Sequence, residues 1–150
     1  MTILTASGAI DLPATTVFDY ASDYRRMPDW VFGLQTVEPL GSRSAGLGAE
    51  FRGTGKVGPI SMTGTGCITG WEPGRLITVS LATHNGIEVS ATVATTGEWG
   101  TTSTQIALTA EYRFPGGIAG KLLQRSVEPM LGAGIRYTER TLRRQCLRVC

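Results

Sequence analysis

TQIALTAEYRF, residues 104–114, is followed at once by PGG, residues 115–117. Apolar and polar side chains alternate along residues 104–114, which is the period of a strand with one buried face. Pro115 and the two glycines end this strand, and apolar residues then recur every three or four positions, as in an amphipathic helix. The chain therefore ends with a strand and a long helix, and that helix must lie against a sheet.

The C-terminal helix is predicted to bury one stripe of side chains and to expose another. The predicted buried stripe consists of Leu123, Val127, Met130, Leu131, Gly134, Thr138 and Leu142. The opposite side carries Lys121, Arg125, Glu128, Arg136, Glu139 and Arg143. Pro129 removes a backbone donor and frees the carbonyl of Arg125, so a bend is expected there. The last residues, with Cys146 and Cys150, are expected to fray.

Five consecutive strands are predicted before this helix, and together they form an antiparallel meander. They cover residues 49–57, 60–71, 75–83, 87–95 and 104–114. Turns are predicted at Gly58-Pro59, at Glu72-Pro73-Gly74 and over Gly97–Thr102. Asn85-Gly86 is typical of a type I′ hairpin turn, because both of its central positions need positive φ.

The N-terminal part is predicted to hold one more strand and two helices. The strand covers Thr2–Asp11, and a helix follows from Pro13 to near Tyr24. A short second helix is predicted over Met27–Val31, and a break from the first helix is expected around Arg25–Arg26 because the residue before a proline avoids the α region. A loop of small residues over Gly41–Gly48 leads into the meander.

Composition limits the classes of protein to which this chain can belong. The chain has 150 residues, of which 41% are hydrophobic and 17% charged, so one globular domain over residues 1–150 is expected. No apolar stretch is long enough to span a membrane, and no signal peptide pattern opens the chain, so a cytoplasmic location is expected. Three cysteines are too few for a disulfide scaffold, which favours reduced thiols.

The charge is unevenly distributed. From Gly117 onward seven bases face two acids, a net charge of +5, so residues 1–116 carry −3 of the total of +2. Aromatic residues do not alternate with the arginines as stacking on bases requires, so no binding of nucleic acid is expected. A solvated helix face explains the charge, and docking of a protein partner on this basic helix is an alternative.

Several short segments together resemble a known family. They are IDLPATTVF (10–18), DY (23–24), PDW (28–30), GLGA (46–49), WEPGRL (71–76), VEP (127–129) and LRR (142–144). In this order and spacing they resemble the START-like superfamily, in particular its polyketide cyclase/dehydrase-like branch. The resemblance covers essentially the whole chain and implies an α+β helix-grip fold. In that fold a curved antiparallel sheet of about six strands, in the order β-α-α-β5-α, wraps around the C-terminal helix and leaves an internal cavity.

This family implies binding of a small hydrophobic or aromatic molecule in that cavity, with no cofactor. Candidate ligand-binding residues are Trp30, Phe32, Phe51, Met62, Ile77, Val79, Leu81, Val89, Leu108, Tyr112, Met130, Gly134 and Tyr137. Gly53, Gly55, Gly64 and Gly66 would share the inner face, where they either allow the sheet to curve or leave room for a ligand.

Catalysis is the open part of this hypothesis. The candidate catalytic groups are the hydroxyls of Tyr112 and Tyr137, which could hold a carbonyl while enolate charge develops, and the turn residue His84. No base obviously accompanies the tyrosines, so a carrier or sensor without activity is an alternative to a cyclase or dehydratase. No metal site is expected, because Cys67, Cys146, Cys150 and the single histidine are not spaced as a ligand set. Both a monomer and a homodimer are compatible with the sequence.

Overall fold

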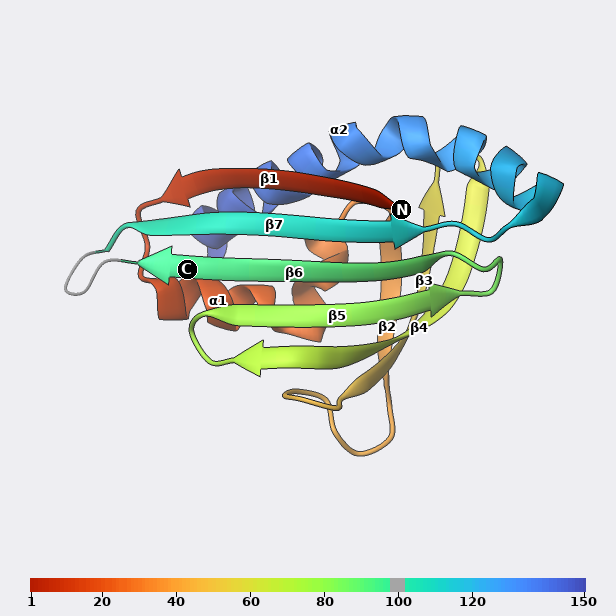
Figure 1. Ribbon diagram of the computed structural model, residues 1–150. Helices are drawn as coiled ribbons and strands as arrows, with labels where there is room; N and C mark the ends of the chain where they lie inside the picture. Colours follow the sequence, from red (N-terminus) through yellow and green to blue (C-terminus); the bar gives the residue numbers. More distant parts are fainter. Residues whose placement is uncertain (98–101) are drawn as a thin grey trace.

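The computed structural model describes residues 1–97 and 102–150 and contains a seven-stranded antiparallel sheet and one long helix (Figure 1). The strands are β1 (Thr2–Ile10), β2 (Leu34–Leu40), β3 (Glu50–Val57), β4 (Ile60–Glu72), β5 (Leu76–Thr83), β6 (Glu88–Gly97) and β7 (Thr104–Arg113), in the spatial order β1-β7-β6-β5-β4-β3-β2. The helices are α1 (Ala14–Ala21), the 3-10 helix η1 (Tyr24–Asp29) and α2 (Gly117–Val149). The predicted α+β helix-grip architecture is confirmed.

The predicted number of about six strands is too low, because β2 was missed. This strand contains Pro39, which cannot donate to a ladder but is tolerated in an edge strand. β2 is an edge strand, since only β3 pairs with it. The N-terminal helices also differ from the prediction. α1 ends at Ala21, and the second helix is a 3-10 helix that begins at Tyr24 and ends before Trp30.

The hairpin between β5 and β6 is confirmed, but its turn type is not the predicted one. Gly86 has φ +90°, whereas no residue other than glycine has positive φ in the described part of the chain, Asn85 included. Thr83 N donates to Ile87 O at 2.9 Å, and Gly86 N donates to Thr83 O at 3.1 Å. These bonds enclose a three-residue loop that ends in a left-handed glycine, the next most common hairpin connection. The turn predicted over Gly97–Thr102 lies mostly on residues 98–101, outside the described residues.

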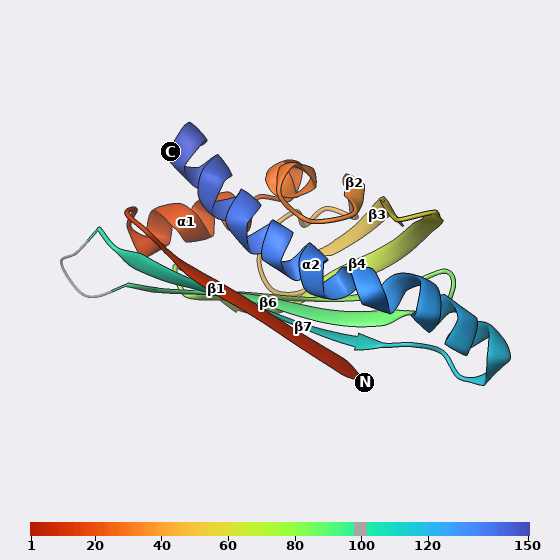
Figure 2. The ribbon, with the colours of Figure 1, turned by 90° about the horizontal axis from the view of Figure 1, so that it is seen from above.

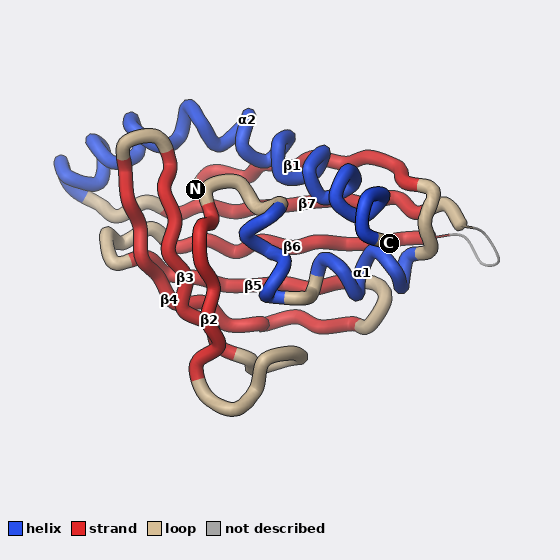
Figure 3. Tube along the Cα trace, turned by 180° about the vertical axis from the view of Figure 1, so that it is seen from behind, coloured by secondary structure: helices blue, strands red, loops and turns tan. Residues whose placement is uncertain are grey.

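Strong curvature of the sheet places β2, β3 and the start of β4 behind α2, opposite the strands β1, β7, β6 and β5 (Figures 2 and 3). The register of β4 on β5 shifts between Ile68 and Gly70, which bends the strand. A Cβ on Gly64 would lie 2.7 Å from the carbonyl oxygen of Ala82 on β5, so this position excludes a side chain. The close approach supports curvature as the reason for glycine at position 64.

α2 packs against β1 and β7, whereas α1 covers β6 and β7, and η1 contacts β2. Two groups of buried side chains result. One unites α1, β1, β7 and the C-terminal half of α2 around Ile106, Leu108 and Leu142. The other joins Phe18 of α1 to the inner face of β3, β4 and β5, with its ring 5.1 Å from that of Trp71. The N-terminal half of α2 therefore faces a part of the sheet that neither group fills.

Glu139 was predicted on the polar side of α2, where it would be exposed. In the structure its side chain is buried, with only 2% exposed. Its Oε1 lies 2.7 Å from Nε of Arg143, and Arg143 Nη2 donates to its Oε2 at 2.9 Å. The pair lies against β1 at Gly8, where an added Cβ would be 2.2 Å from Glu139 Oε1. The absence of a side chain at Gly8 thus lets β1 approach α2 closely enough to cover the ion pair.

Replacement of Arg143 by Met is expected to lower the free energy of unfolding by about 3 kcal/mol, because it leaves the Glu139 carboxylate buried without its partner. Urea denaturation at pH 7 measures this loss. The matched control is Arg144→Met at an exposed position, for which a change below about 0.5 kcal/mol is expected. The double variant Glu139→Leu/Arg143→Met should recover most of the stability. Equal midpoints for Arg143→Met and Arg144→Met would contradict this assignment.

The end of α2 is ordered rather than frayed, since the helix continues to Val149. Cys146 has no exposed surface and packs in the group around Leu142. Burial, with a smaller contribution from the neighbouring Cys150, raises the pKa of the Cys146 thiol to about 12. Cys146 is therefore a protonated, apolar core residue at neutral pH, while Cys150 is exposed.

Candidate functional site

One cross-strand row on the inner face of the sheet brings together four of the predicted ligand-binding residues. The register places Phe51 opposite Gly66, Gly66 opposite Leu81, Leu81 opposite Val89, Val89 opposite Tyr112, and Tyr112 opposite Thr2. Directly opposite side chains lie about 5 Å apart on one face of a sheet. Leu81, Val89 and Tyr112 therefore form a continuous surface, which we call the inner row.

The inner row is only partly buried, although it lies on the face that the helices cover. Leu81, Val89 and Tyr112 are half-buried, as are Met62, Val79 and Ala91 on the same face. The helix α2 packs mainly against β1 and β7. We call these six residues the inner site.

Other predicted ligand-binding residues belong to the packed core instead. They are Trp30, Phe51, Ile77 and Leu108, all less than 9% exposed. Trp30 packs with Tyr20 and Leu142 in the group around α2, so it fills the core. Phe51 lies against Tyr24, with ring centroids 5.4 Å apart. These side chains are therefore part of the packed core beside the inner site and do not belong to its half-buried surface.

On α2 the predicted residues contact chain segments that close the inner face. A Cβ on Gly134 would lie 2.5 Å from Cδ1 of Phe32, so the Phe32 ring rests directly on this glycine. The Phe32 N–H donates to Thr138 Oγ1 at 3.0 Å, and that hydroxyl donates to Gly134 O at 2.9 Å. Met130 touches the turn between β3 and β4, since a Cβ on Gly58 would lie 2.8 Å from its Cε. Phe32 and Met130 thus join α2 to the far half of the sheet.

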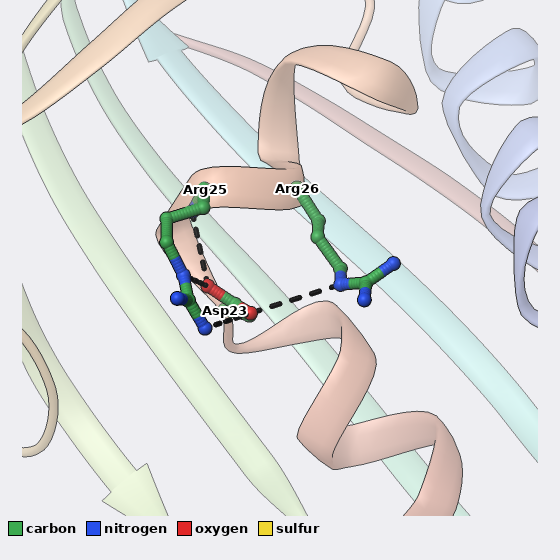
Figure 4. Close-up of polar contacts among 3 residues, drawn as sticks. All are labelled: Asp23, Arg25 and Arg26. Atoms are coloured by element: carbon green, nitrogen blue, oxygen red, sulfur yellow. Dashed lines mark hydrogen bonds and ion pairs between the residues drawn. The ribbon is translucent and has the colours of Figure 1, made fainter. Parts of the chain in front are cut away.

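An ion-pair cluster fixes the segment that delivers Phe32 (Figure 4). Asp23 Oδ1 accepts bonds from Arg25 N at 3.1 Å and from Arg25 Nε at 3.0 Å, and Asp23 Oδ2 lies 3.7 Å from Arg26 Nε. The side-chain hydrogen bond from Arg25 holds the pKa of Asp23 below its usual range, against the opposing effect of burial. Arg26 also lies 5.2 Å above the Tyr20 ring. Asp23 of this cluster caps the N-terminus of η1. The cluster thereby sets the direction of the chain that leads to Trp30 and Phe32.

The two candidate tyrosines lie in different surroundings. Burial raises the pKa of Tyr112 above its ordinary value, so its hydroxyl stays protonated at neutral pH. Among the described residues no partner for that hydroxyl is found, so it is free to donate to a ligand. Tyr137 is 45% exposed and packs edge-on against Phe32, with centroids 6.1 Å apart. Only Tyr112 belongs to the inner site.

His84 is exposed and tied to β4. Its Nδ1 accepts a hydrogen bond from Thr63 N at 3.1 Å, and its backbone N–H donates to Thr63 O at 2.8 Å. The imidazole thus extends the pairing of β4 and β5 at the hairpin. No cluster of three metal-ligating side chains occurs within residues 1–97 and 102–150. None of the helices described there is both long and apolar enough to span a bilayer.

Sequence reasoning missed two features. An open depression of about 570 Å³ is lined by the outward-facing cross-strand row of Glu50, Cys67, Ser80, Ser90 and Glu111, and also by Leu81, Val89 and Tyr112 of the inner row. Alternation predicts these outward side chains to be solvated, and the only signal of the hollow in the sequence is the small size of Cys67, Ser80 and Ser90. The second feature is at the end of the inner row, where Glu128 on α2 accepts bonds from Thr2 at 2.9 Å and from Gln124 at 2.7 Å.

Gly134→Ala is expected to lower the free energy of unfolding by about 1 to 3 kcal/mol, because the added methyl group overlaps the Phe32 ring. Gly132→Ala is the matched control on the same helix, since its Cβ would meet nothing nearer than 3.7 Å. That control should raise stability by up to about 1 kcal/mol through helix propensity. Thermal unfolding of both variants tests the contact, and a stabilising Gly134→Ala would show that Phe32 does not rest there.

The comparisons with known proteins agree with this geometry. The model of the family described as "Polyketide cyclase / dehydrase and lipid transport" matches residues 1–144. No curated protein sequence matches the chain. Solved structures do match the chain. The three structures described next are 12–16% identical to it in sequence.

The aromatase/cyclase Zhui from Streptomyces sp. R1128 is 16% identical, with a TM-score of 0.74 over 98% of this chain and 94% of that one. A START superfamily protein from Mycobacterium smegmatis is 12% identical, with a TM-score of 0.75 over 99% of both chains. The protein TTHA0849 from Thermus thermophilus is 16% identical, with a TM-score of 0.72 over 98% of both chains. At these identities the likeness establishes the shared fold.

Proposed function

Because the chain belongs to the polyketide cyclase/dehydrase and lipid transport family, we propose that it binds a small hydrophobic or aromatic molecule at the inner site. The observation that carries the proposal is the inner row, in which Leu81 and Val89 offer an apolar surface beside the unpartnered hydroxyl of Tyr112. Ligand sites combine such surfaces with few polar groups that orient the ligand. Phe32 and Met130 form the opposite wall.

Apolar burial supplies the affinity in this arrangement. A ligand that covers half-buried aliphatic side chains gains about 25 cal/mol for each Å² of apolar surface removed from water. The protein surface is held in place by core residues such as Ile77, so little reorganisation is needed on binding. The Tyr112 hydroxyl then selects the orientation in which a ligand acceptor faces β7.

A cofactor-free cyclase or dehydratase is the second candidate, and the same hydroxyl favours it. A tyrosine that donates to a ketone oxygen stabilises the negative charge of an enolate, and confinement of a flexible substrate adds to the rate. A base is also required for proton removal. Within the described residues, no histidine or carboxylate occupies a strand position of the inner face. The carboxylate of Glu128 on α2, at the end of the inner row, is engaged by Thr2 and Gln124. We therefore propose ligand binding first and catalysis second.

Ala91→Phe is expected to abolish binding of a neutral fluorescent probe such as N-phenyl-1-naphthylamine, because the added ring occupies the inner site. Ala94→Phe is the matched control, since Ala94 lies on the same strand but on the outer face, opposite Ala107. Fluorescence titration of both variants, with thermal unfolding as the check on folding, measures the effect. Loss of binding in Ala94→Phe but not in Ala91→Phe would move the site to the outer face.

Tyr112→Phe separates the two candidates when a poly-β-ketone is the ligand. For a binding protein the loss of one hydrogen bond should reduce affinity by less than about tenfold. For a cyclase the same change should reduce turnover by about 100-fold or more, far beyond the loss of affinity. We expect the first result. Tyr137→Phe is the control, and a larger effect of that variant would contradict the placement of Tyr112.

A further inference from the structure

The first turns of α2 expose two large aliphatic side chains. Ile118 is 81% exposed and Leu122 is 58% exposed, and Ile118 is the most exposed large hydrophobic residue in the described part of the chain. The two residues are four positions apart, so they are neighbours on one side of the helix. Lys121 and Arg125, both exposed, flank them at helical spacing. We call these four residues the α2 patch.

Local packing directs the α2 patch outward. On the other side of the same turn Gly120 is buried, and a Cβ there would overlap the carbonyl oxygen of Pro115. Pro115 also packs against the β5–β6 hairpin, since a Cβ on Gly86 would lie 3.1 Å from its Cβ. These contacts hold the first turns of α2, which project beyond the ends of the strands (Figures 1 and 2). The aliphatic pair is therefore exposed by the packing of the helix, and none of the described elements covers it.

The charge along α2 is complementary to an anionic partner. This helix, which the structure describes in full, exposes basic side chains and no carboxylate. The exposed bases are Lys121, Arg125, Arg136, Arg140, Arg144 and Arg148. Glu139 is buried against Arg143. Glu128 is half-buried and accepts hydrogen bonds from Thr2 and Gln124, so both carboxylates of α2 are engaged within the protein.

Aliphatic side chains beside exposed bases are typical of helices that bind in the interface of a lipid bilayer. The aliphatic groups enter the boundary between headgroups and acyl chains, while Lys and Arg side chains extend to the anionic headgroups. A protein partner would need a groove that matches this projecting helix. A fluid interface needs no such groove, which favours a membrane as the partner.

We infer that the α2 patch docks the protein on membranes that contain anionic phospholipids. The two aliphatic side chains insert into the interface, and the two bases pair with headgroup phosphates. Arg136 and Arg140 follow Ile118 and Leu122 after five helical turns, on the same side of α2, and extend the positive surface along the bilayer. This inference goes beyond the proposed function and does not depend on a ligand in the inner site.

Co-sedimentation with vesicles tests the inference. The protein should bind vesicles of phosphatidylcholine with about 30% phosphatidylglycerol at least about tenfold more tightly than phosphatidylcholine alone, because bases near an anionic surface add to the affinity. A rise in salt from about 0.1 M to about 1 M should remove most of this preference, since it shortens the Debye length from about 10 Å to about 3 Å. Equal binding to both kinds of vesicle would overturn the inference. Binding to neither would overturn it in favour of an acidic protein partner.

A pair of charge variants tests whether the bases of the α2 patch are responsible. Lys121→Gln/Arg125→Gln should weaken binding to the anionic vesicles by about tenfold or more. The matched control Arg52→Gln/Lys56→Gln removes the same charge from exposed positions on β3, and it should weaken binding by less than about threefold. An equal loss in both variants would show that net charge governs binding, which would overturn the assignment to α2.

A second pair of variants tests insertion of the aliphatic side chains. Ile118→Ser/Leu122→Ser should weaken binding to the anionic vesicles by at least about tenfold, because it removes the apolar surface that leaves water. The control Leu40→Ser/Leu47→Ser, at two other exposed leucines, should bind as the wild type does. Unaltered vesicle binding by Ile118→Ser/Leu122→Ser would contradict the inference. A wild-type protein that bound vesicles but not N-phenyl-1-naphthylamine would contradict the proposed function alone.

Discussion

A single long helix can follow a strongly curved sheet along only part of its surface, and this mismatch organises the molecule. α2 has 33 residues, which corresponds to about 50 Å. It packs against β1 and β7, while the other strands curve away and return behind it (Figure 2). The Glu139–Arg143 ion pair is buried between α2 and β1, where Gly8 has no side chain and lets the two elements approach closely. The inner site lies on the strands that curve away from α2 and do not pack against it as β1 and β7 do.

The far side is joined to α2 by a few specific contacts instead of continuous packing. Phe32 rests on Gly134, and Met130 touches the β3–β4 turn at Gly58. The cluster of Asp23, Arg25 and Arg26 sets the path of the chain toward Phe32 (Figure 4). Between these contacts the side chains of β4, β5 and β6 remain half-buried. The same geometry therefore explains the stability of the fold and the accessibility of its inner face.

Alternation and turn residues made most of the fold predictable. The period of two in residues 104–114 sufficed for β7, and Asn85-Gly86 correctly located the hairpin after β5. Such signals are local, so they do not report contacts between distant parts of the chain. The edge strand β2 was missed because only one neighbour stabilises it and Pro39 interrupts its donors. The type of the hairpin turn was wrong because the three-residue loop depends on bonds between Thr83 and Ile87 across the turn.

Side chains on α2 show where sequence reasoning ends. Helical periodicity correctly assigned Val127, Leu131 and Leu142 to the buried stripe, but it placed Glu139 on the polar side. Burial of this carboxylate depends on the approach of Gly8, 131 positions earlier in the chain, which periodicity within one helix does not register. The same holds for the ligand-binding candidates, where Tyr112 faces the inner site and Tyr137 is exposed.

The amino-acid sequence by itself determined the fold class, the meander and the face that each strand buries, because these follow from local periodicity and turn chemistry. Only the tertiary structure decided which inward side chains are packed and which remain accessible. Trp30, Phe51, Ile77 and Leu108 became core, whereas Leu81, Val89 and Tyr112 stayed half-buried. The physical reason is the distance between the curved sheet and the long helix α2, which no local pattern in the sequence encodes.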